Sequence, residues 1–285
     1  MIRLLIVTGS RADAGILEWP THVLKADDCF DVVELSLWNS TPWTAGAKME
    51  AAINASQPDM VVLVGDRFEI MTAALAAHLA RVPIAHLCGG DRTLGSYDDA
   101  MRDSISRMAT LHFAASSASA RRLSMELGYT HVFLVGNPEI DYVMRTDWKR
   151  ARPYPEPYTV VSYQPQTYDG QDQWGEVVEA IQTTKVIFMA PNPDRGSPVL
   201  QCKMAAHATT LPDAEFHECM PHPEFLNLLA HCEEFIGNSS AIFYLCPFLG
   251  VKTRMFGTRQ DGRVIPFADG RASERIAHHI KAYFA

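Results

Sequence analysis

The sequence predicts an α/β protein with two doubly wound parallel sheets, in two domains that face a cleft. Short apolar runs rich in β-branched residues, such as residues 61–64, alternate with helical stretches along the chain, which is typical of parallel sheets. Polar and glycine-rich turns follow these runs directly, where open parallel sheets bind their ligands. One charged stretch with three prolines, at residues 147–157, interrupts the alternation and indicates an interdomain linker.

These observations predict a first Rossmann-like domain at residues 1–150 and a second at residues 151–285. The chain has 285 residues, of which 47% are hydrophobic, so it has enough apolar material for two modest cores. The second domain is the smaller one, and its stability is expected to depend on the first. The last predicted helix, at residues 273–284, is a candidate to pack back on the N-terminal domain.

In the first domain, each expected strand is a short apolar run suited to burial on both faces of a sheet. The expected strands are residues 4–7, 30–37, 61–64, 84–87, 111–115 and 132–135. Helices are expected after the first strand, at residues 44–56, 72–80 and 116–128, and from residue 98 onward.

In the second domain, the strands alternate with helices in the same way. The expected strands are residues 158–163, 185–189, 235–236 and 252–256, and the expected helices are residues 172–182, 223–231 and 273–284. Ser273 is the expected N-cap of the last helix, because a serine hydroxyl accepts a bond from a free N–H at a helix start.

Composition argues against several functional classes. The net charge is -8 and no long basic run is present, whereas nucleic-acid binding depends on neutralising phosphates. The six cysteines show no CxxC spacing, so neither a zinc site nor a disulfide framework is expected. No signal peptide opens the chain and no apolar run is long enough to span a bilayer, so we expect a cytoplasmic protein without a membrane partner.

Six charged residues follow two neighbouring strands of the first domain, or open the helix after them. They are Asp66, Arg67, Asp91, Asp98, Asp99 and Arg102. Because parallel strands end at the same edge of a sheet, these residues are expected to converge on a crevice for a phosphorylated or sugar-like ligand. Like charges resist joint ionisation, so the adjacent pair Asp98 and Asp99 is the best place for a raised pKa. The sequence leaves open which of the two is catalytic and which only caps the helix.

Seven short motifs occur in a fixed order along nearly the whole chain. They are TGSRADAGIL from Thr8, GDRFE from Gly65, HLCGGD from His86, YDDAMR from Tyr97, PNPDRGS from Pro191, GNSS from Gly237 and GTRQDGR from Gly257. Each motif is a weak signal alone, but their ordered sum resembles the UDP-N-acetylglucosamine 2-epimerase family, closest to its hydrolysing branch.

The resemblance implies the two-domain GT-B fold, with the sugar held by the first domain and UDP mainly by the second. It also implies a reaction that removes the C2 proton of a UDP-sugar, expels UDP and then adds water or UDP, without a cofactor or a metal. Such chemistry needs carboxylates that act as base and acid. Matching the motifs gives the catalytic candidates Asp66, Asp91, Asp98, Asp99 and Arg102. It gives the substrate-binding candidates Arg11, Arg67, Gly89, Gly90, Gln164, Asn192, Ser239, Ser240, Arg259 and Arg263.

The sequence departs from the family mainly on the nucleotide side. Gln164 occupies the position of a family His, and a glutamine forms hydrogen bonds but does not titrate. Leu245 occupies the position of a Glu that would accept bonds from the ribose hydroxyls. On the sugar side, Asp91 replaces a Glu, and the segment before Gly89 lacks an acidic residue or His that is sometimes found there.

These departures leave three interpretations open. The first is a divergent 2-epimerase that acts on a UDP-sugar. The second is a glycosyltransferase that uses a UDP-sugar, for example to glycosylate hydroxymethylated bases in DNA, and only this interpretation includes a nucleic-acid partner. The third is a nucleotide-sugar-binding protein without catalysis. A homodimer is a further expectation.

Overall fold

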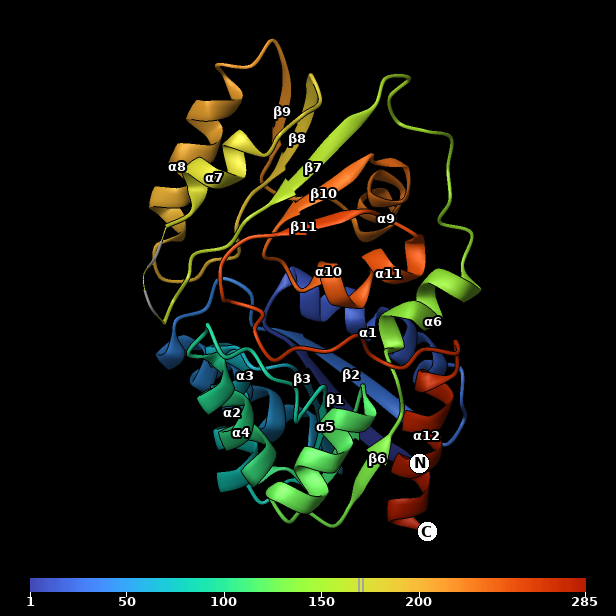
Figure 1. Ribbon diagram of the computed structural model, residues 1–285. Coiled ribbons are helices and arrows are strands. Elements are labelled where there is room, and N and C mark those ends of the chain that lie inside the picture. Colours follow the sequence, from blue (N-terminus) through green and yellow to red (C-terminus); the bar gives the residue numbers. More distant parts are fainter. Residues whose placement is uncertain (169, 171) are drawn as a thin grey trace. The chain divides into compact units, whose positions relative to one another are not determined.

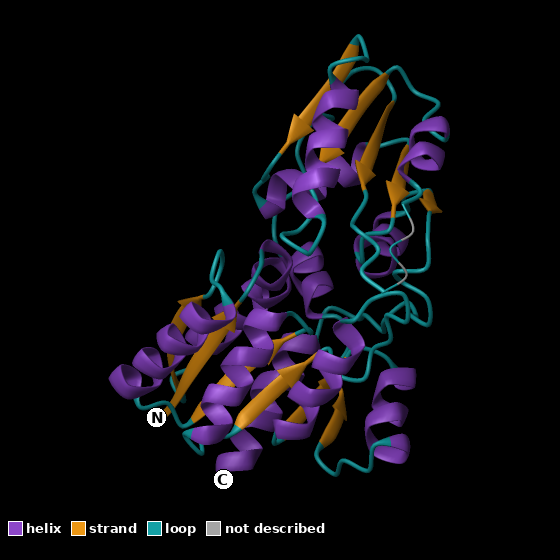
Figure 2. Cartoon of the chain, turned by 90° about the vertical axis from the view of Figure 1, so that its left-hand side faces the viewer, coloured by secondary structure: helices purple, strands orange, loops and turns teal. Residues whose placement is uncertain are grey.

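The computed structural model describes residues 1–168, 170 and 172–285. The chain folds into two compact units, and in each unit helices pack against one parallel sheet (Figures 1 and 2). Unit 1 consists of residues Met1–Arg92, Asp98–Arg145 and Pro266–Ala285, and unit 2 consists of Thr93–Tyr97 and Thr146–Ile265. The predicted α/β class with two parallel sheets is confirmed.

Unit 1 contains a six-stranded parallel sheet in the order β2-β1-β3-β4-β5-β6. Its strands are β1 (Ile2–Thr8), β2 (Phe30–Ser36), β3 (Met60–Val64), β4 (Ile84–Leu87), β5 (Leu111–Ala114) and β6 (Val132–Leu134). From β1 the chain first adds β2 on one side and then β3 on the other, so the winding reverses between β1 and β3. Doubly wound sheets bind ligands at the carboxyl ends of strands that flank such a reversal.

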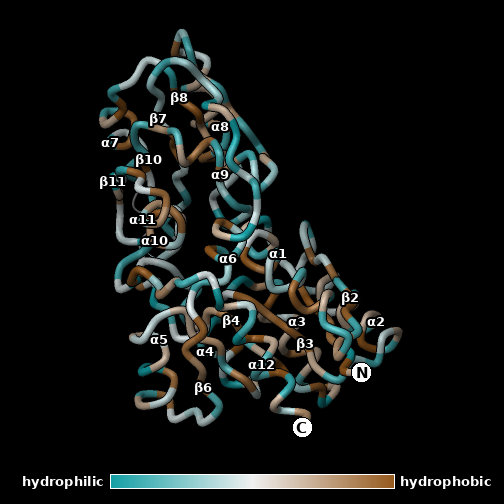
Figure 3. Tube along the Cα trace, turned by 90° about the vertical axis from the view of Figure 1, so that its right-hand side faces the viewer, coloured by the Kyte–Doolittle hydropathy of each residue, from teal (hydrophilic) through white to brown (hydrophobic). Residues whose placement is uncertain are grey.

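The helices of unit 1 form two groups. Helices α2 (Pro42–Ser56), α3 (Phe68–Leu79) and α4 (Asp98–Met108) pack in sequence against one another, as do α1 (Arg11–Lys25), α6 (Pro138–Arg145) and α12 (Ala272–Phe284). A short helix α5 (Ser117–Arg121) continues into a π-helical turn, η1 (Arg122–Glu126). All five residues of β3 are apolar and buried, as the brown trace of this strand illustrates in Figure 3. The core therefore fixes the carboxyl end of β3 rigidly.

Helix α12 begins differently from the expectation. Its N-cap is Arg271, which gives no side-chain capping bond, and Ser273 lies inside the helix. The carboxylate of Asp141 instead accepts bonds from the backbone N–H groups of Ala272 (3.1 Å) and Ser273 (2.6 Å). The prediction of Ser273 as N-cap was wrong because a carboxylate from α6, distant in sequence, satisfies these donors.

Unit 2 contains a five-stranded parallel sheet in the order β11-β10-β7-β8-β9. Its strands are β7 (Tyr158–Ser162), β8 (Lys185–Met189), β9 (Asp213–His217), β10 (Glu234–Gly237) and β11 (Thr253–Met255). Its helices are α7 (Trp174–Glu179), α8 (Ser197–Ala208), α9 (His222–His231), α10 (Ala241–Tyr244) and α11 (Cys246–Leu249). Here the winding reverses between β7 and β10, which makes their carboxyl ends the equivalent ligand-binding position.

Two parts of unit 2 go beyond the predicted elements. Strand β9 and helix α8 were not expected, because the alternating polar residues of β9 resemble a loop. The proline-rich stretch 147–157 folds against unit 2. The Arg150 N–H donates to Asn227 (2.9 Å), Asn227 donates to the Ala151 carbonyl (3.1 Å), and the Tyr154 hydroxyl donates to Glu215 (2.7 Å).

Candidate active site

One buried guanidinium, that of Arg102, forms ion pairs with two of the candidate acidic residues of unit 1. The Arg102 side chain is 2% exposed and forms ion pairs with Asp66, which follows β3, and with Asp99, one turn earlier on α4. The same guanidinium donates to the backbone carbonyl of Asp91 (2.7 Å). The Asp66 and Asp99 side chains are each 19% exposed, so they are more accessible than the cation between them. Residues that follow β3, that follow β4 and that open α4 thus meet at one charged centre.

Asp91 and Asp98 differ from the other two acids in their surroundings. The carboxylate of Asp91 is buried and accepts a bond from the Ser119 hydroxyl (2.6 Å) at the start of α5. Asp98 is the first residue of α4 and is half-buried. Because the Asp91 carboxylate bonds to Ser119 while its carbonyl bonds to Arg102, this residue is better suited to positioning than to proton transfer.

His86 fixes the loop that carries Asp66. Its Nε2 lies 2.8 Å from the Gly65 carbonyl oxygen and its Nδ1 lies 3.0 Å from the Ser106 hydroxyl on α4. Complete burial lowers the pKa of His86 to about 4, so the ring is neutral at physiological pH. A neutral ring donates through one nitrogen and accepts through the other, which matches a carbonyl on one side and a hydroxyl on the other. His86 was not among the site residues expected from the sequence, although it opens the HLCGGD motif.

A second charged group lies at the carboxyl ends of β1 and β3. The Arg67 guanidinium contacts the buried carboxylate of Glu69 (3.2 and 3.3 Å). Asp13 is buried, with 5% of its surface exposed, and accepts a bond from the Gly9 N–H (2.9 Å). Burial raises the pKa of Asp13 to about 6, although the positive charge of Arg67 opposes this shift. Asp13 was not among the site residues expected from the sequence, where its only signal is an acidic residue two positions after Arg11.

The remaining candidates of unit 1 are Arg11, Gly89 and Gly90. Arg11 is the first residue of α1, immediately after the capping Ser10. Gly89 and Gly90 are both buried, and a Cβ at Gly89 would lie 3.0 Å from the side chains of both His86 and Ser106. These two glycines therefore allow close packing beneath the charged centre.

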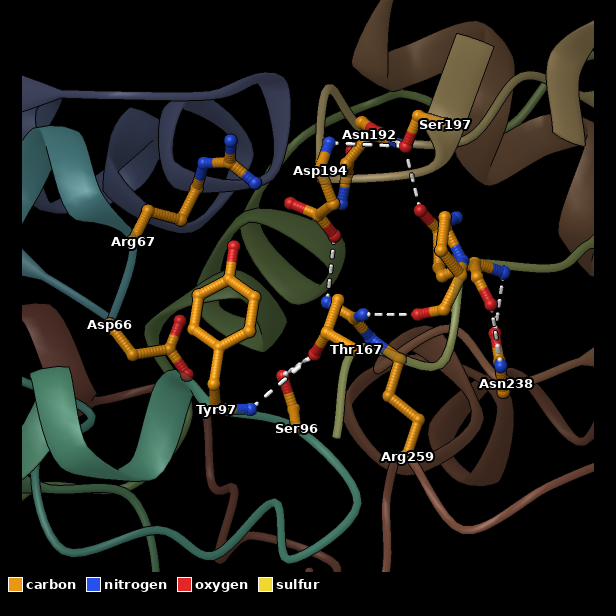
Figure 4. A network of polar contacts seen from close by, with 12 residues as sticks. Asp66, Arg67, Ser96, Tyr97, Thr167, Asn192, Asp194, Ser197, Asn238 and Arg259 are labelled. Carbon is orange, nitrogen blue, oxygen red and sulfur yellow. Dashed lines mark hydrogen bonds and ion pairs between the residues drawn. The ribbon is translucent and has the colours of Figure 1, made fainter. Parts of the chain in front are cut away.

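In unit 2, a network of amide groups joins the carboxyl ends of three strands (Figure 4). Gln164 follows β7, and its backbone N–H and carbonyl bond to the Asn238 side chain beyond β10 (2.6 and 2.9 Å). The Gln164 side-chain oxygen accepts a bond from the Asn192 N–H beyond β8 (2.7 Å). Gln164 is buried, so its side chain positions these loops around the reversal of the sheet.

Arg259 is held within the same group of loops (Figure 4). Its guanidinium pairs with Asp194 (2.8 Å) and donates to the Pro165 carbonyl (2.7 Å), and both side chains of the ion pair are less than 10% exposed. Arg263 lies further along the loop, with its guanidinium carbon 5.3 Å from the centre of the Tyr244 ring. The structure therefore shows that Arg259 stabilises the loops.

The GNSS motif connects β10 to α10. Ser239 and Ser240 are half-buried, and the Ala241 N–H lies 3.4 Å from the Ser239 hydroxyl. Leu245 is 2% exposed and belongs to the apolar interior. Among the described residues, no cluster of three or more His, Cys, Asp or Glu side chains is arranged to hold a metal ion. Nor does the described part of the chain contain a helix with the length and apolarity needed to cross a membrane.

A family model for UDP-N-acetylglucosamine 2-epimerase matches residues 44–265, which is most of the chain. The chain belongs to the UDP-N-acetylglucosamine 2-epimerase family. The resemblance inferred from the ordered motifs is thereby confirmed. The match contains the Asp66–Arg102–Asp99 centre of unit 1 and the amide network of unit 2, and it stops just before the chain returns to unit 1.

Two curated relatives illustrate the range of this family. The GDP/UDP-N,N'-diacetylbacillosamine 2-epimerase (hydrolyzing) of Campylobacter jejuni is 29% identical over 230 residues, which cover 73% of this chain and 58% of the relative. The polysialic acid biosynthesis protein P7 of Escherichia coli is 26% identical over 317 aligned positions, which cover 93% of this chain and 81% of the relative. The chain thus spans little more than half the length of the Campylobacter epimerase.

Solved structures of family members show the same fold. Staphylococcus aureus MnaA, determined with UDP, superposes with a TM-score of 0.81 at 17% identity and covers 100% of this chain and 97% of its own. The Neisseria meningitidis UDP-GlcNAc 2-epimerase, determined with UDP-GlcNAc, gives a TM-score of 0.80 at 14% identity and covers 99% of this chain and 100% of its own. The predicted GT-B-like fold is therefore confirmed.

Proposed function

We propose that this family member is a nucleotide-sugar enzyme that breaks the C2–H and C1–O bonds of a UDP-linked 2-acetamido sugar. The observation that carries the proposal is the centre formed by Asp66, Arg102 and Asp99. Both carboxylates share one guanidinium, and a carboxylate is the group that the proposed base requires. The side chains of the two acids are also more exposed than that of Arg102, at 19% against 2%.

The proposed reaction has two steps. In the first, Asp66 or Asp99 accepts the C2 proton, the C1–O bond breaks with its electron pair going to the diphosphate, and UDP leaves. The product of this step has a double bond between C1 and C2. In the second, a carboxyl group delivers its proton to C2 from the opposite face and water adds its hydroxyl to C1. The proton that water gives up returns to that carboxylate, while the base releases the C2 proton to solvent. Asp98, beside Asp99 at the start of α4, is our candidate for this acid.

The nucleotide is assigned to unit 2. Support comes from the reversal between β7 and β10, where the hydroxyls and backbone N–H groups of the GNSS motif lie. Gln164 has no proton to exchange at neutral pH, so on this side the protein contributes binding and positioning only. UDP and UDP-GlcNAc are the ligands named for the S. aureus and N. meningitidis structures, and they are the first ligands to examine.

Three further expectations remain predictions. The proposed reaction is redox-neutral overall, so we expect no redox cofactor, and we also expect no resident metal. We expect the protein to act in the cytoplasm. We also expect a homodimer, which sedimentation analysis of the purified protein tests directly.

The decisive assay is UDP release from UDP-GlcNAc in the absence of any acceptor. The proposal predicts steady release of UDP together with free N-acetylmannosamine. Release that occurs only when an acceptor such as hydroxymethylated DNA is present would instead identify a glycosyltransferase. Tight binding of UDP-GlcNAc without any turnover would identify a binding protein, and either result would overturn the proposal.

A further inference from the structure

The segment Thr93–Tyr97 connects, along the chain, the unit that we assign to the nucleotide with the helix that carries Asp98 and Asp99. It follows Arg92 and precedes Asp98, and both neighbours belong to unit 1. Residues 93–97 nevertheless fold as part of unit 2. We call this segment the 93–97 strap. Its C-terminal end is joined by one peptide bond to Asp98, the first residue of α4.

The strap is bound to unit 2 by hydrogen bonds to two loops. The Leu94 N–H donates to the Asp261 carbonyl (2.9 Å) in the loop after β11. The Ser96 hydroxyl lies 3.1 Å from the Thr167 hydroxyl, and the Tyr97 N–H lies 3.4 Å from the same oxygen, in the loop after β7 (Figure 4). Thr93 and Ser96 are each only 3% exposed. The strap is therefore seated within unit 2 at both ends.

Gly95 is the point of closest approach. A Cβ at this position would overlap the Thr258 carbonyl group and would lie 2.6 Å from the Arg259 nitrogen. Both obstacles are backbone atoms, which cannot turn away as a flexible side chain can. Any larger residue at position 95 must therefore separate the strap from the loop after β11.

The loops beneath the strap are the loops that we assign to the nucleotide. The Gln166 side-chain oxygen accepts bonds from the Thr258 N–H (2.7 Å) and hydroxyl (3.1 Å), which joins the loop after β7 to the loop after β11. Arg259 adds its bond to the Pro165 carbonyl. Gln164 extends this network to the loops after β8 and β10. A ligand that orders this network also orders the loops that bind the strap.

We propose that the 93–97 strap couples binding of a nucleoside diphosphate at the loops of unit 2 to the position of Asp98 and Asp99 at the start of α4. This inference rests on the proposed assignment of the nucleotide to unit 2. Leu94, Ser96 and Tyr97 form hydrogen bonds with other parts of unit 2. Because one peptide bond joins Tyr97 to α4, the strap cannot move far without moving the start of this helix. In this role Gly95, Ser96 and Thr167 are positioning residues.

The test measures backbone hydrogen exchange in residues 98–108, with and without UDP, alongside calorimetric titration of UDP. In the wild-type protein, UDP is expected to slow exchange at the start of α4 several-fold, because local opening becomes rarer. In Gly95→Ala, UDP should bind within about threefold of the wild-type affinity, while the protection of α4 is lost. Turnover of UDP-GlcNAc should fall by about tenfold in kcat with little change in KM.

Two controls distinguish a loss of coupling from a general effect of the substitution on folding. Gly175→Ala adds the same methyl group on α7 of unit 2, where a Cβ would meet nothing within 4 Å, and it should behave as the wild type. If Gly95→Ala fails to fold, the pair Ser96→Ala and Thr167→Val removes the hydroxyl contact without adding bulk. The single variant Thr167→Ser should retain the protection, because it keeps both hydroxyls.

The outcomes separate the two claims. If UDP binds the wild-type protein but leaves exchange in α4 unchanged, the strap does not couple the sites, although the proposed function stands. Full protection of α4 in Gly95→Ala or in the hydroxyl variants would also show that the strap does not couple them. If the wild-type protein does not bind UDP at all, the proposed function fails and this inference fails with it.

Discussion

At the scale of single residues, Arg102 contributes most to the organisation of the candidate active site. It is one of the most completely buried side chains in the chain, and it is surrounded by two carboxylates and a carbonyl. A buried cation of this kind is tolerated because its donors are satisfied by charged partners. The arrangement holds Asp66 and Asp99 in fixed positions before any substrate arrives, which is the condition for efficient proton transfer.

Asp99→Asn tests the catalytic assignment at this centre. The amide oxygen still accepts a bond from Arg102, so we expect the melting temperature to change by only a few degrees. The amide does not accept a proton, so kcat should fall at least about 100-fold. Asp103→Asn is the matched control, because Asp103 lies one turn later on α4 and pairs with Arg122 of η1 instead of Arg102. Wild-type turnover by Asp99→Asn would remove this residue from the mechanism.

Asp13 provides a prediction about pH and stability. Burial raises its pKa from 3.8 to about 6 in the folded protein, so the unfolded chain loses this proton first as pH rises. The unfolded state is then favoured increasingly between about pH 4 and pH 6, and the penalty is constant above that range. Asp13→Asn cannot ionise and still offers an acceptor to Gly9. Above pH 6 it should be more stable than the wild type by up to about 3 kcal/mol, with no gain at pH 4.

Urea unfolding at several pH values between 4 and 7 measures this effect. The variant Asp147→Asn is the control, since the Asp147 side chain is 98% exposed. A stability difference between Asp13→Asn and the wild type that stays constant across this range would show that Asp13 does not titrate as the structure indicates.

At the scale of elements, the edge strand β9 depends on an ion-pair network. Glu215 accepts bonds from Lys185 (2.7 Å), Tyr154 (2.7 Å) and His217 (3.0 Å). Partial burial acts to raise the pKa of Glu215, but these bonds outweigh it and lower the pKa to about 2. Charged side chains along an exposed edge also discourage pairing with other strands.

Glu215→Gln should therefore destabilise the protein at neutral pH. We expect a loss of about 1 kcal/mol, a small value because the site is partly exposed to solvent. The folded pKa lies below the unfolded one, so the stabilising effect is present above about pH 4.5 and is lost as pH falls toward 2. Thermal unfolding at pH 7 and pH 3 should thus show a deficit that shrinks on acidification. Glu179→Gln, on the exposed face of α7, serves as the control.

The element scale also shows what the sequence could and could not predict. The buried strands β1, β3, β4, β7 and β8 were expected from their apolar runs, because burial on both faces leaves a continuous pattern. Strand β9 was missed because one of its faces carries the polar residues Asp213, Glu215 and His217, and the two carboxylates pair with Lys185 of β8. The cap of α12 was wrong for the same reason, since Asp141 comes from another helix.

The candidate site likewise combines features that the local sequence predicts with features that depend on tertiary contacts. The convergence of Asp66, Asp99 and Arg102 was predictable, since Asp66 follows β3 and the other two lie near the start of α4, the helix after the adjacent strand β4. The bridging role of His86 and the burial of Asp13 were not, because both depend on distances that no local pattern encodes. Gln164 was identified only as a departure from the family, and its bond to the Asn192 N–H appears only in the structure.

At the scale of the whole molecule, the chain passes between the two units four times, at residues 92/93, 97/98, 145/146 and 265/266. Unit 1 is therefore completed only by the last twenty residues, Pro266–Ala285. Helix α12 packs on α1 and α6, with Ile276 and Ile280 fully buried and the His279 ring stacked on Phe133 at 3.8 Å. A cut near residue 150 removes this helix from unit 1.

A fragment of residues 1–150 tests this dependence. Without α12, the apolar faces of α1 and α6 are exposed and the Asp141 carboxylate has lost its backbone partners. We expect the fragment to melt without a cooperative transition, as followed by circular dichroism, and a fusion of residues 1–145 to 266–285 through a short flexible linker to regain cooperativity. Cooperative melting of the 1–150 fragment near the temperature of the full chain would contradict the structural role of α12.

The most direct test of the proposed function follows the C2 proton itself. Purified protein is incubated with UDP-GlcNAc in heavy water and the reaction is followed by proton NMR, with Asp99→Asn as the control. We predict that the C2 proton signal disappears as UDP is released, and that free N-acetylmannosamine carries deuterium at C2. Retention of the original C2 proton in a released sugar would contradict the account, because UDP would then have left without the elimination that Asp66, Asp99 and Arg102 are proposed to catalyse.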